Sequence, residues 1–524
     1  MVSQQQDIVA ERTHANRWKT LGVLSLSLVI IGLDNTILNV ALPTLQAEFS
    51  ASASTLQWMV DAYLLVFAGL LLVFGTLGDR LGRKLALQSG ISIFGIASLG
   101  ALIADTSGEV IAIRALMGVG AALIMPATLS IIANVFPAEE RGKAIGIWAA
   151  LAAVGIGLGP LAGGLLIDWF DWSAVFLLNV PVALIAVLLG IRLVPESRDP
   201  RPGAFDIAGA VLSTTGFTVL VYAIIEAPGA GWTSGTTLGL LAAAAALLAA
   251  FVAWERHTPD PMLDLAFFRN ARFSVGTAAV SIAFFALLGG IFALTQFLQF
   301  AHGYSAIEAG AVMTPLALGL VMGAGSSSKA VDRIGTAPVV AAGLTGVGIV
   351  LASTVLWDPS IGAGLLLLWF FLLALSMGWV MAPATEAVVG AVPAARSGVA
   401  SAMNTVARMV SGALGVAVIG SLVNSIYRTD LEPHVTGLPA PAREAAGESI
   451  GAAGAVAAHL PGDAGSALMA GAADAFTGAM GIGMVVAGAV SLAAAVLVAR
   501  VLPGKPAPEP VAAERRGSSI TASR

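Results

Sequence analysis

Residues 56–84 read LQWMVDAYLLVFAGLLLVFGTLGDRLGRK, an apolar run that ends in a cluster of charges. The run 56–78 is longer than the roughly 20 residues that a helix needs to cross a bilayer. Its apolar residues occur on all sides of a helix, whereas a surface helix of a soluble protein keeps a polar face. The stretch therefore predicts a membrane-spanning helix followed by a charged loop.

The composition of the whole chain also indicates a lipid environment. Apolar residues make up 57% of the 524 residues and charged residues only 11%, against about 25% charged residues in soluble domains. The mean hydropathy is +0.89. The chain has no cysteine, which excludes a disulfide framework and a thiolate metal site. Disorder of the whole chain and nucleic-acid binding are excluded as well, and the polar residues 1–20 do not resemble a cleaved signal peptide.

Runs of similar length recur along the chain and predict an all-α polytopic membrane protein with 14 spans. A transmembrane β-barrel would show alternation of apolar and polar residues instead. The predicted spans are 20–41, 56–78, 84–104, 109–134, 143–167, 173–194, 206–226, 234–254, 273–299, 307–327, 336–356, 361–384, 398–422 and 480–502.

The positions of lysine and arginine predict the orientation of these spans. Of the 26 Lys and Arg residues, Arg114 and Arg408 lie inside predicted spans, and Arg428 and Arg443 lie in the segment 423–479. All the others fall on one side of the membrane if both termini are cytoplasmic, as the positive-inside rule requires. We therefore expect both termini in the cytoplasm. The segment 423–479 is then external, either as a short helical hairpin or as a mobile loop.

An internal repeat divides the chain. Asp79-Arg80-Leu81-Gly82 follows the second span, and Asp332-Arg333-Ile334-Gly335 follows the tenth. A second pair of similar segments, around Arg141 and Arg396, follows the fourth and twelfth spans. Two six-helix bundles around a midplane cavity are typical of transporters. We expect a first bundle at 1–195, an inserted helix pair at 196–265, a second bundle at 266–502 and a disordered cytoplasmic tail at 503–524.

Four motifs in this order resemble the major facilitator superfamily, and within it the 14-span drug/proton antiporters that include quaternary-ammonium and antibiotic exporters. The loop 75–84 resembles the cytoplasmic signature of the superfamily, and residues 33–43 (LDNTILNVALP) resemble the first-span signature of the 14-span branch. Residues 114–120 resemble the fourth-span motif, and residues 155–164 the antiporter motif of the fifth span. The resemblance implies a membrane transporter without a cofactor or metal.

Three charged residues are candidates for proton coupling. Asp34 lies inside the first predicted span, where a carboxylate is costly and therefore a functional candidate. Arg114 lies at a similar depth in the fourth span, so we expect it to pair with Asp34 and to sense its protonation. Asp61 lies near the outer end of the second span and is a candidate for a proton relay or for cargo binding. The alternatives are a structural ion pair for Asp34, and contact of Arg114 with lipid headgroups.

The expected cargo site combines aromatic and polar side chains. Trp58 and Tyr63 flank Asp61, and aromatic faces beside a carboxylate suit a lipophilic cation. The two rings could equally belong to the aromatic belt of the membrane interface. Asn404 and Arg408 lie in the thirteenth span and are candidates for the second half of the cargo site. Some members of the family that this chain resembles have an acidic residue in the thirteenth span. This sequence has none there, and the resemblance therefore argues against recognition of dications.

Two further groups are expected to control conformational change. The first is a cytoplasmic latch, in which Asp79 lies near the N-terminus of a helix of the other half or pairs with Arg141. Its members are Gly75, Asp79, Arg80, Gly82, Arg83 and Arg141. The second is the antiporter motif, whose small residues allow close helix contact and whose proline allows a kink. Its members are Gly155, Gly159, Pro160, Gly163 and Gly164.

The sequence thus predicts a proton-coupled efflux transporter for lipophilic, often cationic or aromatic compounds, monomeric in a bacterial cell membrane. The abundance of arginine over lysine, with much Ala and Gly, favours a bacterial source. The sequence contains no nucleophile–base pattern and no phosphate-binding loop, so it supports neither an enzyme nor an ATP-driven pump. Three alternatives remain open: an exporter of a lipid or cell-envelope precursor, an uptake symporter on the same scaffold, and a membrane receptor that does not transport.

Overall fold

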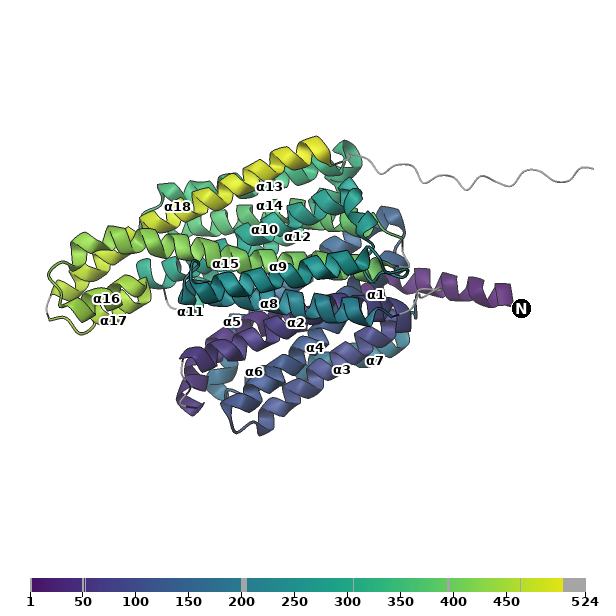
Figure 1. Cartoon of the computed structure of the whole chain (residues 1–524), viewed down its shortest axis with the longest axis horizontal. Helices are drawn as coiled ribbons and strands as arrows, with labels where there is room; N and C mark the ends of the chain where they lie inside the picture. The colour runs from purple at the N-terminus through teal and green to yellow at the C-terminus, as the bar shows by residue number, and fades with distance from the viewer. Residues whose placement is uncertain are drawn as a thin grey trace, which may run out of the picture.

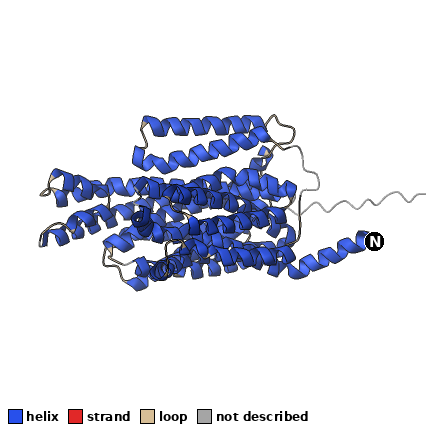
Figure 2. Cartoon of the chain, turned by 90° about the horizontal axis from the view of Figure 1, so that it is seen from below, coloured by secondary structure: helices blue, strands red, loops and turns tan. Residues whose placement is uncertain are grey.

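The computed structural model describes residues 2–49, 51, 53–198, 205–304, 306–393, 396–461 and 463–502. Within these residues the chain is helical throughout, with connecting loops and no strand (Figure 2). Long helices run side by side, with the first helix ending the molecule on one side and the pair α16–α17 on the other (Figure 1).

The helices cover all the predicted spans. The first group comprises α1 (Val2–Phe49), α2 (Ala53–Leu81), α3 (Arg83–Gly100), η1 (Ala101–Ile103), α4 (Ser107–Val135), α5 (Ala138–Trp169), α6 (Ala174–Leu177) and α7 (Asn179–Leu193). A pair follows, α8 (Ile207–Ala230) and α9 (Gly235–Glu255). The last group comprises η2 (Leu265–Arg269), α10 (Ala271–Gln296), η3 (Phe297–Ala301), α11 (Ala306–Met313), α12 (Pro315–Ile334), α13 (Thr336–Ala352), η4 (Ser353–Leu356), α14 (Ala363–Val389), α15 (Ser397–Val435), α16 (Ala440–Glu448), α17 (Ile450–Ala457) and α18 (Asp463–Val501).

Among the described residues, 12 helices are long and apolar enough to cross a membrane. Two of the predicted spans, 20–41 and 143–167, lie within α1 and α5, which are 48 and 32 residues long but are not among those 12. The chain is an all-helical, multi-pass membrane protein. The count of fourteen spans and the side on which the termini lie stay predictions.

The repeated Asp-Arg-aliphatic-Gly segments have the same backbone geometry. Gly82 separates α2 from α3 with φ 126°, and Gly335 separates α12 from α13 with φ 88°. Both values lie in the region where a side chain would be strained, so glycine is favoured at each position. The sequence repeat is therefore also a structural repeat, a sharp break between two consecutive long helices.

Two large clusters of buried apolar side chains form the interior. The first is built mainly from α1–α7 and the second from α10–α18. α8 packs on α2 and α15, α9 packs on α8, and Phe217 of α8 and Phe251 of α9 join the first cluster. Figure 1 shows this pair crossing in front of the other helices. The boundaries predicted at 195 and 265 agree with this arrangement but stay predictions.

The segment 423–479 differs from a simple loop. α15 continues to Val435 and α18 begins at Asp463, so both helices extend beyond the predicted spans, and α16 and α17 connect them. Tyr427 and Leu431 of the extension are buried, and Tyr427 Oη donates to Ala446 O over 3.2 Å. The apolar pattern of the predicted span 398–422 thus continues, at helical spacing, into the segment that connects α15 to α18. The tail 503–524 lies outside the described residues.

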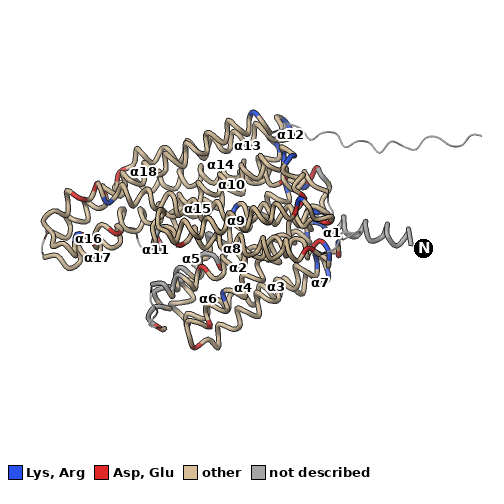
Figure 3. The backbone as a smooth tube through the Cα atoms, in the orientation of Figure 1, with Lys and Arg blue, Asp and Glu red and all other residues tan. Residues whose placement is uncertain are grey.

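The charges separate the two ends of the bundle. Figure 3 shows Lys and Arg gathered at the end where α1 begins, whereas few of them lie at the end with α16 and α17. This basic end carries the two repeated Asp-Arg segments.

Candidate functional site

A buried ion pair joins α1 to α4. Arg114 Nη1 donates to Asp34 Oδ2, and the two side chains are exposed by only 2% and 1%. Arg114 Nε also donates to the carbonyl of Met59 on α2, over 3.0 Å. Three helices therefore meet at one guanidinium group. The structure brings Asp34 and Arg114 together and places them away from lipid.

The aromatic ring of Tyr63 completes this centre. The guanidinium carbon of Arg114 lies over the ring at 4.5 Å from its centroid, and Tyr63 is fully buried. Asp34 Oδ1 and Tyr63 Oη are buried and have no hydrogen-bond partner among the described residues. Unpartnered buried polar atoms are unfavourable. Asp34 thus has one oxygen held by Arg114 and a second that can accept a proton.

The predicted cargo residues of α2 have different surroundings. Trp58 is 37% exposed and stacks on Tyr222 of α8, with ring centroids 6.0 Å apart. Tyr63 instead lies against Arg114 inside the bundle. Asp61 is partly buried on the same helix. The structure therefore brings Tyr63 to the ion pair and Trp58 to the inserted pair of helices, and it does not gather both rings around one point.

Arg408 of α15 lies where the two groups of helices meet. Its guanidinium carbon is 5.8 Å from the ring centroid of Trp148 on α5 and 5.0 Å from that of Phe284 on α10. Arg408 is 6% exposed, and no carboxylate forms an ion pair with it in the described part of the chain. Asn404, one turn away, is fully buried, and neither polar atom of its side chain has a hydrogen-bond partner in the part of the chain that the structure describes.

Asp79 links the two halves at the basic end. Its Oδ2 accepts from the backbone N–H groups of Gly398 and Val399, over 2.8 and 3.2 Å, in the first turn of α15. Its Oδ1 accepts from Arg83 Nε over 2.7 Å. A carboxylate at a helix N-terminus is favoured by the unpaired N–H groups and by the helix dipole. Of the two partners expected for Asp79, the structure shows the helix N-terminus and not Arg141.

The other latch residues surround this contact. A Cβ at Gly75 would lie 2.7 Å from Ala402 Cβ and 2.8 Å from Gly398 O, so α2 and α15 touch there through their backbones. Gly82 makes the break described above, and Arg80 lies over the ring of Phe205 at 5.5 Å. Arg141 Nη2 donates to Ala133 O over 2.9 Å.

Glu386 is a second carboxylate between the halves, and its position was not predicted. Glu386 belongs to α14 and is partly buried. A Cβ on Gly142 of α5 would lie 2.6 Å from its Oε2, and Arg141 acts on it electrostatically. Asp79 and Glu386 thus each reach from one group of helices toward the N-terminal part of a helix in the other. Their spacing in the sequence gives no signal for this pairing.

The antiporter motif packs α5 on α1 beside Asp34. Gly155, Gly159 and Gly163 are buried and recur every four residues, so they lie on one face of α5. A Cβ at Gly155 would lie 2.7 Å from Val29 O and 3.1 Å from Leu33 N, both backbone atoms of α1. Pro160 and Gly164 also lie in α5, but their side-chain surroundings are outside the described residues.

We predict that Gly155→Ala lowers the stability of the protein by about 1–3 kcal/mol, because its methyl group would push α1 away from α5. The change would displace the backbone next to Asp34 and lower transport as well. Thermal unfolding and transport of the purified variant check this. Gly239→Ala is the matched control, since nothing lies within 4 Å of that position in α9. Equal behaviour of the two variants would contradict the close contact.

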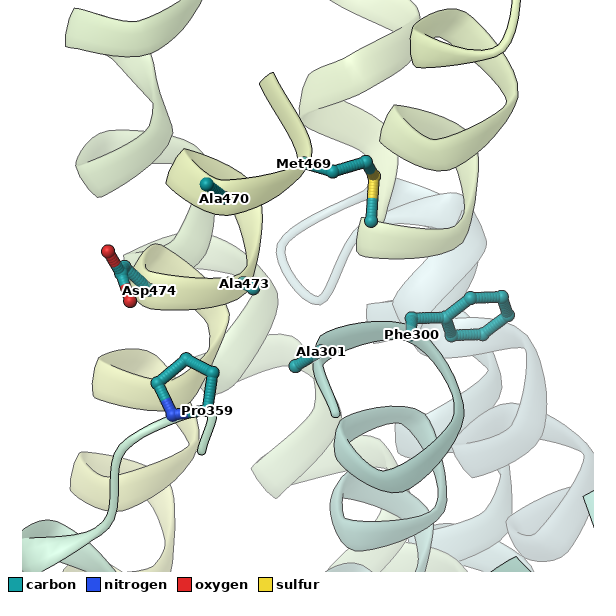
Figure 4. A pocket seen from close by; sticks show the side chains of 7 residues that line it. All are labelled: Phe300, Ala301, Pro359, Met469, Ala470, Ala473 and Asp474. Carbon is teal, nitrogen blue, oxygen red and sulfur yellow. The ribbon is translucent and has the colours of Figure 1, made fainter. Parts of the chain in front are cut away.

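A surface pocket lies apart from these residues. It has a volume of about 310 Å³ and is lined by Phe300 and Ala301 of η3, by Pro359, and by Met469, Ala470, Ala473 and Asp474 of α18 (Figure 4). All these residues belong to the second group of helices, and none is a predicted site residue. Within the described residues, no group of three or more His, Cys, Asp or Glu side chains is placed to hold a metal ion.

Comparison with known proteins identifies the family. Residues 24–416 match the Major Facilitator Superfamily. The chain belongs to this superfamily. It is 37% identical to the multidrug efflux pump LfrA of Mycolicibacterium smegmatis, over 93% of this chain and 96% of that protein. It is 35% identical to the tetracenomycin C resistance and export protein of Streptomyces glaucescens, over 95% of each chain.

Other relatives and solved structures agree with the superfamily. The methyl viologen resistance protein SmvA of Salmonella typhimurium is 33% identical, over 92% of this chain and 97% of that protein. The human organic anion transporter MFSD10 has a similar fold, with a TM-score of 0.60 and 15% identity over 92% of this chain and 99% of that chain. The proton:xylose symporter XylE has a TM-score of 0.57 at 17% identity, and the match covers 93% of this chain and 96% of that chain. At this identity the likeness shows the fold alone.

Proposed function

We propose that this superfamily member is a proton-driven exporter of lipophilic drugs and antibiotics. Relatives named as multidrug, antibiotic and methyl viologen resistance proteins support an efflux function over nearly the full length of the chain. The observation that carries proton coupling is the buried pair of Asp34 and Arg114, in which one oxygen of Asp34 has no hydrogen-bond partner among the described residues. We also propose fourteen spans with both termini in the cytoplasm, which places the basic end on the cytoplasmic side.

In the proposed mechanism, Arg114 and a proton compete for the carboxylate of Asp34. Arg114 holds the carboxylate when Asp34 is ionised, and a proton that binds Asp34 removes the charge that Arg114 needs. Breaking a buried ion pair costs about 3–5 kcal/mol when one charge is left without a partner. Protonation therefore drives Arg114 to a new arrangement with Met59, Tyr63 or cargo. Because Arg114 joins α1, α2 and α4, this change reaches the helices that face the other half.

The contacts at the basic end support a state closed to the cytoplasm. Three contacts join the two groups of helices there. Asp79 of α2 accepts from the N-terminus of α15, Gly75 lies against Ala402, and Glu386 lies against Gly142. Breaking them would open the cytoplasmic side. Alternation between the two states would carry cargo across while Asp34 takes up and releases protons. Asn404 Oδ1 and Nδ2 and Arg408 Nε have no hydrogen-bond partner within the described residues. This supports a cargo role, because an open state would offer these atoms water or cargo as partners.

Transport in everted membrane vesicles tests the proposal. With a proton gradient imposed, a fluorescent lipophilic cation should be pumped into vesicles that contain the protein and not into control vesicles. Collapse of the gradient should stop accumulation. Cargo movement in the opposite direction, with the protons, would favour the symporter alternative. Selective transport of a lipid precursor would favour the alternative that the protein exports a lipid or cell-envelope precursor.

We predict that Arg408→Met raises thermal stability while lowering export. Arg408 is a buried cation without a carboxylate partner in the described structure, and replacing a poorly compensated buried charge by an apolar side chain can stabilise by about 1–4 kcal/mol. Thermal unfolding and vesicle transport measure the two effects. Arg192→Met is the control, because Arg192 is exposed at the end of α7. Loss of stability in Arg408→Met would mean that the charge is well compensated.

A further inference from the structure

Two buried carboxyl groups lie at the base of the α8–α9 pair, outside the centre described above. Asp206 precedes α8, and its Oδ1 accepts from Gly209 N over 2.8 Å and from Trp254 Nε1 over 2.9 Å. Glu255 is the last residue of α9, and its Oε2 accepts from Leu263 N over 2.9 Å. The exposed fractions are 9% for Asp206 and 4% for Glu255. Each group therefore uses one oxygen to hold local backbone or an indole ring.

The second oxygen of each group lacks a donor. Asp206 Oδ2 and Glu255 Oε1 are buried and have no hydrogen-bond partner in the described structure. A Cβ built on Gly209 would touch both atoms, so they lie next to the same point, and the two carboxyl groups interact. Two carboxylate oxygens at close range repel each other unless a proton or a cation lies between them. In the described residues no group of three or more potential ligands is placed to hold a metal ion.

The ends of the two helices decide which group carries the proton. Asp206 is at the N-terminus of α8, where the helix dipole and the N–H of Gly209 favour a negative charge. Glu255 is at the C-terminus of α9, where the dipole disfavours a negative charge. The neutral acid at Glu255 can donate from Oε1 to Asp206 Oδ2 while its Oε2 still accepts from Leu263 N. This arrangement satisfies every oxygen of the pair.

Among the described residues, no Lys, Arg or His forms an ion pair with Asp206 or Glu255. From α2, Arg80 lies over Phe205, the residue before Asp206. After α9, Arg256 is exposed, and the exposed His257 bonds through Nδ1 to Ala253 O. In the loop that follows, Asp264 pairs with Arg396, and Asp260 is exposed. Among these groups, the charge that acts on Glu255 is that of Asp206.

We propose that Asp206 and Glu255 form a proton-binding site, separate from Asp34, in which Glu255 holds the proton and donates it in a hydrogen bond to Asp206. The proton ties the start of α8 to the end of α9. Through Leu263 it also ties both to the segment that leads into α10. Loss of the proton leaves two facing negative charges and loosens this junction at the basic end of the molecule.

Infrared difference spectroscopy of the reconstituted full chain tests the site directly. Between about pH 5 and about pH 9, beyond the ordinary range of a carboxyl group, the wild type should show a protonated-carboxyl band from Glu255. Glu255→Gln should lose this band, because glutamine keeps the shape and a donor but cannot titrate. Glu226→Gln, a glutamate at the other end of α8, should keep it, and so should Asp34→Asn. A band unchanged in Glu255→Gln would overturn the proposal.

A second variant keeps the test decisive if Glu255→Gln folds poorly. Asp206→Asn retains an acceptor for Gly209 and Trp254 but removes the facing negative charge. The Glu255 band should then disappear at lower pH than in the wild type. An unchanged pH dependence would refute the pairing. Because this readout needs no transport, its outcome is independent of the efflux function proposed above.

Thermal unfolding supplies a third readout. The folded protein holds a proton that the unfolded chain has released, so stability should fall as the pH rises. Glu255→Gln should flatten this dependence, whereas Glu226→Gln should leave it unchanged. Parallel curves for the wild type and Glu255→Gln would contradict a proton held at this junction.

Discussion

Replacing Asp34 by asparagine is expected to abolish proton-driven efflux. Asparagine keeps the size of the side chain, but it cannot take up a proton and cannot neutralise Arg114. One pH unit supplies about 1.4 kcal/mol per proton, which corresponds to about a tenfold cargo gradient. The steady-state accumulation of cargo in vesicles under a one-unit gradient should therefore fall by at least about tenfold. Uptake of a fluorescent cation measures this loss.

Exchange of labelled for unlabelled cargo separates coupling from folding in the same variant. Exchange needs no proton gradient, so Asp34→Asn should retain it if the protein is folded and only the coupling is lost. Arg114→Lys is a useful companion, because a lysine keeps the charge but cannot hold Asp34 and Met59 in the same planar geometry. We expect weakened coupling in that variant. Full proton-driven accumulation in Asp34→Asn would refute the proposed role of Asp34.

Replacing Asp79 by alanine should shift the protein toward a state that is open at the basic end. The change removes the acceptor for two N–H groups of α15 and leaves the buried Arg83 without its carboxylate. Loss of a helix-capping side chain alone costs about 0.5–2 kcal/mol. About 1.4 kcal/mol changes a conformational ratio tenfold, so we expect a shift of about 2- to 30-fold.

Spin-label distance measurements can follow this shift, because the chain has no native cysteine. Leu81→Cys with Ile334→Cys places labels on exposed ends of α2 and α12 at the basic end. Trp169→Cys with Leu356→Cys places them on exposed positions at the opposite end. Asp79→Ala should lengthen the first distance and shorten the second. Asp79→Asn, which keeps one acceptor, should shift the distances less. Unchanged distances in both pairs would contradict a latch at Asp79.

Part of the site was accessible to sequence reasoning. A carboxylate and a guanidinium at similar depth in two spans of one half have few other partners in a membrane, so the meeting of Asp34 and Arg114 followed from their positions along the chain. The close approach of small residues in 155–164 to another helix followed in the same way. Both inferences use only the residues of a single span and their depth in the membrane.

Other contacts depend on packing that no single stretch records. The sequence allowed Asp79 two partners, and only the crossing of α2 and α15 selects the first turn of α15. Glu386 lies against Gly142 of α5 in the other group, a contact that nothing in its own span indicates. Trp58 and Tyr63 are five residues apart, but the rotation of α2 turns one ring toward α8 and the other toward Arg114. The pairing of Asp206 with Glu255 likewise needs α8 and α9 folded side by side.

By itself, the sequence determined that the chain lies in a membrane, that its long apolar runs are helices, and that an Asp-Arg-aliphatic-Gly segment recurs at 79–82 and 332–335. Hydrophobic length and a short repeat are local properties, so they are visible in the order of the amino acids. Only the tertiary structure decided which buried polar atoms meet across helices and which stay without a partner. Those contacts depend on the rotation and crossing of helices far apart in the chain, which side-chain packing fixes.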